Sequence, residues 1–329
     1  MAFPKSQKSI LSLKSLLFTP GTKSDRFDRA AGVHADALII DLEDAVAPSA
    51  KKEAREASLR YLEALSISLP CVLRINAPDT RVGLDDLHAL LNSSAEPDYL
   101  ILPKCDSSAT IRSIHNLLRE AGKSTKIIAL IETAKGVGAL DEIVGGTIKP
   151  AALLFGAADM AADLGAETAW EPLLWVRSRI IQAAAVTEVP VFDSPYFDIA
   201  DVNGLKRETE ASAHLGFHGK CAIHPAQIAT INQVLTPTEE EVAKARQVLV
   251  VNKQGVGSVD GKMVDEAIAR KVSSYSKEPE SQLRIRFFRR VQNEKQIIKR
   301  RSHGEDTVSI PGTRAEALPR NIRPLLRRL

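Results

Sequence analysis

The sequence predicts one α/β domain of the (β/α)8 (TIM) barrel type, followed by a helical lid segment and a basic extension. Eight short apolar runs alternate with helical stretches over about 210 residues, a pattern typical of parallel strands joined by helices. Nearly every run also ends in a polar side chain. Because the carboxyl ends of barrel strands build one rim, these side chains are expected to converge there. An open doubly wound sheet would not need polar residues at every strand end.

The expected strands are short apolar runs bounded by turn-forming residues, as strands covered on both faces are. They cover residues 15–18, 37–40, 70–74, 99–102, 126–131, 151–155, 189–192 and 219–223. Helices are expected at 24–31, 50–65, 85–91, 108–120, 139–144, 170–187, 201–215 and 239–251. The polar residues at the strand ends are Asp41, Glu43, Arg74, Asn76, Lys104, Glu132, Asp159, Asp193 and His224.

We expect four segments along the chain. Residues 1–14 are polar and rich in Lys and Ser, and are expected to be flexible, whereas residues 15–236 form the barrel. Residues 237–271 hold a helix and then closely spaced glycines, which suits a hinged lid. Residues 272–329 lose the apolar period and are expected to be disordered.

The net charge of +3 conceals an asymmetry. Residues 272–329 hold 14 Lys and Arg against 6 Asp and Glu, while the preceding 271 residues hold 30 against 35, so only the extension is basic. The three cysteines are far apart and form no metal-binding pattern, which favours reduced thiols in the cytoplasm. No apolar run is long enough to span a membrane, and the amino terminus lacks a signal-peptide core. We therefore expect a cytoplasmic protein with no membrane partner.

Glu132 and Asp159 follow consecutive strands, the fifth and the sixth. A carboxylate at the end of a buried strand is costly to desolvate unless it meets a cation, a metal ion or a substrate. Two of them suit Mg²⁺, which commonly takes one or two carboxylates together with water and substrate oxygens. The alternative is that each carboxylate caps a helix or pairs with a nearby lysine. Lys104 and Lys220 are expected either to be rim cations or to be such partners.

Arg74 lies within a short apolar strand, so its guanidinium needs an anion. Its planar donors match a substrate carboxylate, and a buried ion pair with Asp41 or Glu43 is the alternative. Both can hold together, with Glu43 orienting Arg74 toward substrate. The turn at Thr19, Pro20 and Gly21, with Lys23 and Arg26 after it, could hold phosphates or could be a solvated charged face. His224 is expected to have a structural role.

The order of these motifs resembles a known family. LLFTPGTKSDRF, ALIIDLEDAV, LRIN, LPK, IALIETAKGV, LLFGAADMAADLG, VFDSPYFDI, LGFHGKCAIHPAQI and VDGKMVDEA occur in that order across residues 12–270. Together they resemble the citrate lyase β-subunit-like branch of the HpcH/HpaI aldolase superfamily, which includes malyl-CoA and citramalyl-CoA lyases. The basic extension after the last motif departs from the family, and we assign it no function.

The resemblance implies a barrel with Mg²⁺ on Glu132 and Asp159 and a 2-oxo acid that chelates the metal while Arg74 binds its carboxylate. It places the CoA thioester of the substrate on Thr19, Pro20, Lys23 and Arg26. The mobile lid maps onto Asp265, which in relatives reaches the site of a neighbouring subunit in a homotrimer, where it would protonate the enolate. The expected partners are therefore an acyl-CoA, a 2-oxo acid and other copies of this chain.

Four functions are compatible with the sequence. The leading one is an Mg²⁺-dependent carbon–carbon lyase that cleaves citramalyl-CoA or malyl-CoA. The second is the β subunit of citrate lyase acting on a citryl-carrier thioester, and the third is a related acyl-CoA thioester hydrolase. The fourth is a non-enzymatic scaffold that binds nucleic acid or another polyanion through the basic extension, which the motifs favour least.

Overall fold

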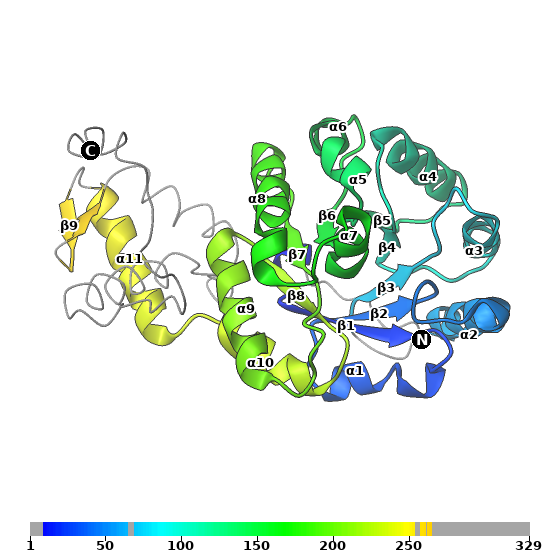
Figure 1. The fold of residues 1–329 in the computed structure, drawn as a ribbon, viewed down its shortest axis with the longest axis horizontal. Coiled ribbons are helices and arrows are strands. Elements are labelled where there is room, and N and C mark those ends of the chain that lie inside the picture. The colour runs from blue at the N-terminus through cyan, green and yellow to red at the C-terminus, as the bar shows by residue number, and fades with distance from the viewer. Residues whose placement is uncertain (1–8, 65–68, 254–256, 261, 265–329) are drawn as a thin grey trace, which may run out of the picture. The chain divides into compact units, whose positions relative to one another are not determined.

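The computed structural model of the protein describes residues 9–64, 69–253, 257–260 and 262–264. Eight parallel strands form a closed barrel in sequence order, with β1 hydrogen-bonded to β8, which confirms the predicted fold class (Figure 1). The strands are β1 (Ser15–Pro20), β2 (Ala37–Asp41), β3 (Cys71–Arg74), β4 (Tyr99–Leu102), β5 (Lys126–Ile131), β6 (Ala152–Phe155), β7 (Val191–Asp193) and β8 (Gly219–Ala222). Each begins and ends within two residues of its predicted position.

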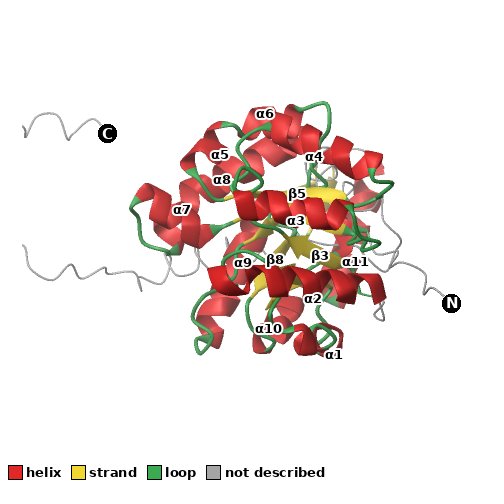
Figure 2. Cartoon of the chain, turned by 90° about the vertical axis from the view of Figure 1, so that its right-hand side faces the viewer, coloured by secondary structure: helices red, strands yellow, loops and turns green. Residues whose placement is uncertain are grey.

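Helices enclose the barrel strands (Figure 2). They are α1 (Arg29–Gly32), α2 (Lys51–Ala64), α3 (Arg81–Leu91), α4 (Ser108–Glu120), α5 (Ala134–Gly138), α6 (Leu140–Gly145), α7 (Ala157–Leu164), α8 (Trp170–Thr187), α9 (Val202–Leu215) and α10 (Ala226–Leu235), and α11 (Glu239–Lys253) follows them in the chain. Several begin at side-chain caps: Thr133 accepts from Gly136 N–H before α5, and Asp201 accepts from Gly204 N–H before α9. Such caps satisfy amide groups that the first turn leaves unpaired.

Alternate residues of each strand pack on opposite faces, which explains the continuous apolar runs. Ile39, Val72 and Ile128 belong to a cluster made largely of strand residues, which fills the barrel interior. Their chain neighbours Leu38, Ile40, Leu73, Ile127 and Ala129 belong to a second cluster that also contains helix residues. The strand layer is therefore buried on both sides, and polar groups are accommodated mainly at its ends.

One prediction near the amino end was wrong, and a second segment there has more structure than its polar sequence indicates. Within residues 9–14, Ile10–Ser12 form a 3-10 turn capped by Ser9, and Leu13 is fully buried in the barrel interior. The helix expected at 24–31 is instead a 3-10 turn, Ser24–Arg26, followed by the short α1. Phe27 lies between them, where it is buried with its ring edge-on to Tyr61.

The segment predicted as a lid contains α11 and a hairpin of β9 (Gly257–Val259) and β10 (Lys262–Val264). Lys244 Nζ of α11 lies 3.4 Å from Asp260 Oδ2 in the hairpin turn. Asp265 and the basic extension lie outside the described residues. Among the helices that are described, none is long and apolar enough to cross a membrane.

Candidate active site

Arg74 and Asp41 end adjacent strands and are paired in register. Arg74 Nε donates to Asp41 Oδ1 at 2.7 Å and Nη2 donates to Asp41 Oδ2 at 2.6 Å, a bidentate geometry. Arg74 Nη1 lies 3.1 Å from Glu43 Oε2, and the guanidinium stacks 4.9 Å above the ring of Phe18. The ion pair expected with Asp41 or Glu43 is thus formed with both carboxylates, and Nη1 also lies 3.7 Å from Asp44 Oδ2.

The loop that carries Glu43 is held by a lysine that the sequence did not single out. Lys51 Nζ donates to the carbonyl oxygens of Leu42 and Glu43 at 2.8 and 2.7 Å and to Asn76 Oδ1 at 2.7 Å. Asn76 in turn donates to Asp86 Oδ2 at 2.6 Å. Lys51 belongs to a helix with many charged residues, so nothing in the pattern distinguishes it from surface lysines. Burial raises the pKa of Glu43, although Arg74 acts in the opposite direction.

Glu132 directly follows β5, and Asp159 lies in the first turn of α7, directly after β6. Glu132 is 1% exposed and accepts a hydrogen bond from the backbone N–H of Lys104 at 2.9 Å. Burial, followed by the negative charges of Glu43 and Asp159, raises the pKa of Glu132 to about 8. Gly156 makes room for this side chain, because a Cβ there would lie 2.6 Å from Glu132 Oε2.

The ammonium of Lys104 joins three carboxylates. Its Nζ donates to Glu43 Oε1 at 2.9 Å and lies 3.6 Å from Asp159 Oδ1 and 3.8 Å from Glu132 Oε1. The predicted alternative of a carboxylate–lysine pair is therefore present. Glu43, Glu132, Asp159 and Arg74 thus share one rim and form a connected set of charges.

Glu132 and Asp159 present carboxylate oxygens of the kind that divalent cations bind. The Lys104 ammonium already lies near one oxygen of each, and the missing Cβ at Gly156 leaves room for the Glu132 carboxylate. Within the part of the chain that the structure describes, no group of three His, Cys, Asp or Glu residues could hold a metal by itself. Two carboxylates completed by water and substrate oxygens agree with the usual demands of Mg²⁺.

The turn after β1 is shaped by Gly21. Its N–H donates to Asp41 O at 2.8 Å, and a Cβ at Gly21 would lie 2.8 Å from Leu42 Cδ2. Thr19 is buried, whereas Lys23 and Arg26 are exposed at the 3-10 turn that follows. The two cations are therefore accessible to a ligand from solvent.

Polar residues at the ends of β7 and β8 do not join this rim, contrary to the prediction that all strand-end polar residues converge. Asp193 is fully buried, and it accepts from Arg177 Nε at 3.1 Å and from Lys220 Nζ at 2.7 Å. Val191, two residues earlier, packs in the outer cluster, so Asp193 points toward the helices. Lys220 also donates to Glu208 Oε1 at 2.8 Å, and is thus a structural partner. His224 has a local structural role, because its Nδ1 accepts from Ala226 N–H before α10.

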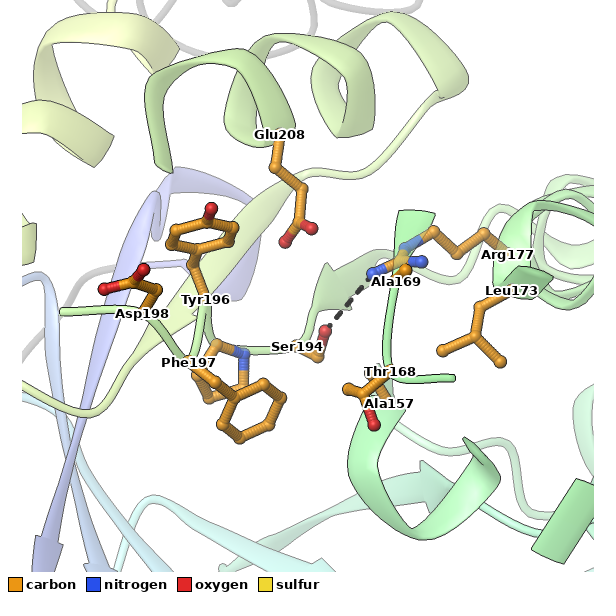
Figure 3. A pocket seen from close by; sticks show the side chains of 11 residues that line it. Ala157, Thr168, Ala169, Leu173, Arg177, Ser194, Tyr196, Phe197, Asp198 and Glu208 are labelled. Atoms are coloured by element: carbon orange, nitrogen blue, oxygen red, sulfur yellow. Dashed lines mark hydrogen bonds between the residues drawn. The ribbon is translucent and has the colours of Figure 1, made fainter. Parts of the chain in front are cut away.

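A separate pocket of about 270 Å³ opens near the ends of β6 and β7 (Figure 3). Arg177 from α8, Ser194 and Tyr196 from the loop after β7, and Glu208 from α9 line it. None of the predicted site residues lines this pocket, although Ala157 of its wall belongs to the same helix as Asp159.

The fold and the charged rim define a (β/α)8 barrel enzyme, a class in which the active site lies at the carboxyl ends of the strands. The chain belongs to the HpcH/HpaI aldolase/citrate lyase family, whose model matches residues 14–225. L-malyl-CoA/β-methylmalyl-CoA lyase of Cereibacter sphaeroides is 30% identical over 284 residues, which cover 76% of this chain and 89% of the relative. Citrate lyase subunit beta of Escherichia coli K12 is 33% identical over 276 residues, with 79% and 90% covered.

The chain is also similar to solved structures. RipC from Yersinia pestis is 44% identical with a TM-score of 0.63, covering 70% of this chain and 99% of that structure. CitE from Mycobacterium tuberculosis, solved with magnesium, acetoacetate and coenzyme A, is 32% identical with a TM-score of 0.67, covering 79% and 96%. The resemblance inferred from the motifs is thereby confirmed, and the chain is a carbon–carbon lyase of this family.

Proposed function

We propose that the protein is an Mg²⁺-dependent lyase that cleaves a 3-hydroxyacyl-CoA of the citramalyl or malyl type into acetyl-CoA and pyruvate or glyoxylate. The observation that carries the proposal is the convergence of Glu43, Glu132 and Asp159 on one cation position, next to the guanidinium of Arg74. That arrangement suits a substrate that brings both a carboxylate and a metal-binding oxygen.

Glu132 and Asp159 would hold the metal. When bound, Mg²⁺ would polarise the oxygen that becomes the ketone and would offset its growing negative charge. Magnesium in the structures of the M. tuberculosis relative supports this assignment. The conformational freedom of Glu132 is small, because it is 1% exposed and its Oε1 accepts from the Lys104 amide, so the ligand is preorganised.

Arg74 would bind the substrate carboxylate through Nη1 and Nη2. Asp41 fixes the Nε edge of the guanidinium, and Glu43 lies beside Nη1, so the two acids orient the arginine. Each Nη atom carries two N–H donors, so a substrate carboxylate would use donors that these acids leave over and would form charge-assisted hydrogen bonds, which are stronger than neutral ones. Arg74 and Glu43 thus act on the reacting groups by binding and by orientation.

The CoA portion would lie over the turn after β1. Thr19 and Pro20 form the end of β1, and Lys23 and Arg26 are exposed immediately after it. Two accessible cations suit the phosphates of CoA, and the thioester would then extend toward the rim. The names of the malyl-CoA lyase relatives support a CoA thioester as substrate.

The reaction needs no co-reactant. The substrate hydroxyl gives its proton to water, and the bond between the hydroxyl-bearing carbon and the carbon next to the thioester breaks. The electron pair of that bond stays with the thioester fragment as an enolate, and one proton converts it to acetyl-CoA. We assign that proton to the carboxyl group of Asp265, supplied by the lid of a neighbouring subunit in a homotrimer, and Asp265 regains a proton from water.

A second candidate is the β subunit of citrate lyase, because the E. coli relative carries that name at 33% identity. It would cleave a citryl thioester on a carrier protein rather than on CoA. A thioester hydrolase would instead release free CoA without a 2-oxo acid.

The test is product formation from (S)-citramalyl-CoA and, separately, malyl-CoA, with Mg²⁺ and with EDTA. We expect equimolar acetyl-CoA and 2-oxo acid, lost with the chelator and in Glu132→Gln. Exposed Asp141→Asn is the matched control and should remain active. Silence on both substrates, or free CoA alone, would reject the proposal and favour the carrier-linked or hydrolytic alternatives.

A further inference from the structure

Lys104 has an uncommon backbone for a lysine. Its φ of 50° lies in the left-handed region, which residues with a side chain seldom adopt. Lys104 lies two residues after the end of β4. In this conformation its backbone N–H donates to Glu132 Oε1 and its ammonium donates to Glu43 Oε1. A residue held in such a conformation at a rim of charged groups indicates a functional constraint rather than a surface lysine.

The ammonium is shared unequally among its partners. It donates a hydrogen bond to Glu43 at 2.9 Å but lies at 3.6 and 3.8 Å from Asp159 and Glu132. The Lys104 side chain is 41% exposed, whereas Glu43 and Glu132 are 7% and 1% exposed. The carboxylates of Glu43 and Glu132 are therefore largely shielded from water, whereas the Lys104 side chain can move toward solvent.

A divalent ion and this ammonium compete for the same oxygens. Mg²⁺ binds carboxylate oxygens at about 2.0–2.1 Å, so an ion on Glu132 and Asp159 would meet the like charge of the ammonium at close range. Glu43 remains as a partner for a lysine that withdraws. A metal ion from solution would therefore replace the Lys104 ammonium beside Glu132 and Asp159.

We infer that Lys104 is a positioning residue that acts as the internal counter-ion of the metal-free site, and that a divalent metal binds by displacing its ammonium from Glu132 and Asp159. This inference rests on the metal site of the proposed function. It assigns Lys104 two effects: it keeps three converging carboxylates together without metal, and it lowers the affinity for metal.

The test is calorimetric titration of Mn²⁺ into the full-length protein and into Lys104→Met. We expect Lys104→Met to bind Mn²⁺ at least about tenfold more tightly, because the competing charge is gone. Its thermal midpoint in EDTA should fall below that of the unaltered protein, and Mn²⁺ should close the gap. Lys104→Arg, which keeps the charge, should retain ordinary affinity. It also provides a second variant should the methionine form fold poorly.

The matched control is Lys135→Met, which removes an exposed positive charge on α5 that pairs with Asp106 at 2.6 Å. Its affinity should stay unchanged. Equal or weaker binding by Lys104→Met, or equal tightening in both variants, would overturn the inference and leave the proposed function standing. Absence of Mn²⁺ binding by the unaltered protein would overturn both.

Discussion

At the scale of single residues, Gly156 determines whether Glu132 can take its observed position. An alanine Cβ would lie 2.6 Å from both Cβ and Oε2 of Glu132, and the backbone φ of −107° itself permits alanine. We predict that Gly156→Ala displaces the carboxylate and weakens Mg²⁺ binding by about tenfold or more, since ligands held loosely lose affinity. Calorimetric titration of metal measures this directly.

Gly138→Ala is the control for Gly156→Ala. Gly138 ends α5, and a Cβ there meets nothing within 4 Å. It should bind metal normally. Equal affinity in both variants would show that Glu132 does not depend on the space at Gly156.

Arg74→Lys tests the fork geometry. Lysine keeps the charge but cannot donate in parallel to both oxygens of Asp41 and also face a substrate. Loss of one charge-assisted hydrogen bond costs about 1.5–3 kcal/mol, so kcat/KM should fall roughly 10- to 150-fold. Arg207→Lys, where the arginine is 72% exposed, should leave kcat/KM unchanged. Equal kcat/KM values for Arg74→Lys and Arg207→Lys would contradict a role for the planar guanidinium of Arg74.

The sequence predicted residues at this scale where a polar side chain lies within or just after an apolar strand. Arg74, Glu132 and Asp159 were selected in this way, and the structure brings them to one rim. Lys51 could not be found, since its function depends on three acceptors from two loops that are distant in sequence. The competition that we assign to Lys104 likewise depends on distances that no pattern contains.

At the scale of elements, Asp193 joins β7 to α8 and, through Lys220, to β8 and α9. Asp193 and Lys220 are both fully buried, and Arg177 is 2% exposed. Asp193→Asn removes a negative charge that neutralises the buried ammonium of Lys220. It should therefore lower the free energy of unfolding by about 3–5 kcal/mol. Denaturant unfolding measures the change. Asp141→Asn, whose pair with Arg179 is 75% exposed on the aspartate side, should cost no more than about 1 kcal/mol.

The ionisation of Asp193 should make the stability of the protein depend on pH. Burial alone would raise the pKa of Asp193, but Lys220 and Arg177 lower it below its ordinary value of 3.8. The Asp193 carboxylate therefore contributes fully to the free energy of unfolding above pH 3.8, where Asp193 is ionised in the unfolded chain as well. The contribution is lost as the pH falls through the lower pKa of the folded state. The stability difference between the unaltered protein and Asp193→Asn should be constant above about pH 5 and shrink below about pH 4. A difference that grows in acid would refute this assignment.

The sequence located these strands but not the direction of every side chain. Asp193 was expected at the rim because it ends a strand, yet two residues earlier Val191 packs outward, and Asp193 shares that face. Because the side-chain period of a strand is two, a shift of one residue decides between the barrel mouth and the helix layer. Strand boundaries predicted to within two residues cannot make that decision.

At the scale of the whole molecule, the barrel and the basic extension should have separable properties. Residues 272–329 carry the positive excess, while the predicted site residues all precede them. A chain ending at residue 271 should keep kcat/KM within about twofold and lose any salt-sensitive retention on heparin. Loss of turnover together with retained fold would instead make the extension part of the enzyme.

The proposed action of Asp265 across subunits makes a prediction about mixtures. Asp265→Asn lacks the lid acid, and Glu132→Gln lacks a metal ligand, so each should be inactive alone. In mixed trimers, a site with intact Glu132 can receive an intact Asp265 from a neighbouring Glu132→Gln subunit. In a ring of three subunits that contains both variants, one site in three combines intact Glu132 with intact Asp265 from its neighbour, so the mixed trimers should show about a third of full activity per subunit. Coexpression with two affinity tags, followed by a turnover assay of the doubly purified mixture, measures this. If Asp265 acted within its own subunit, every site would lack one group and the mixture would stay inactive.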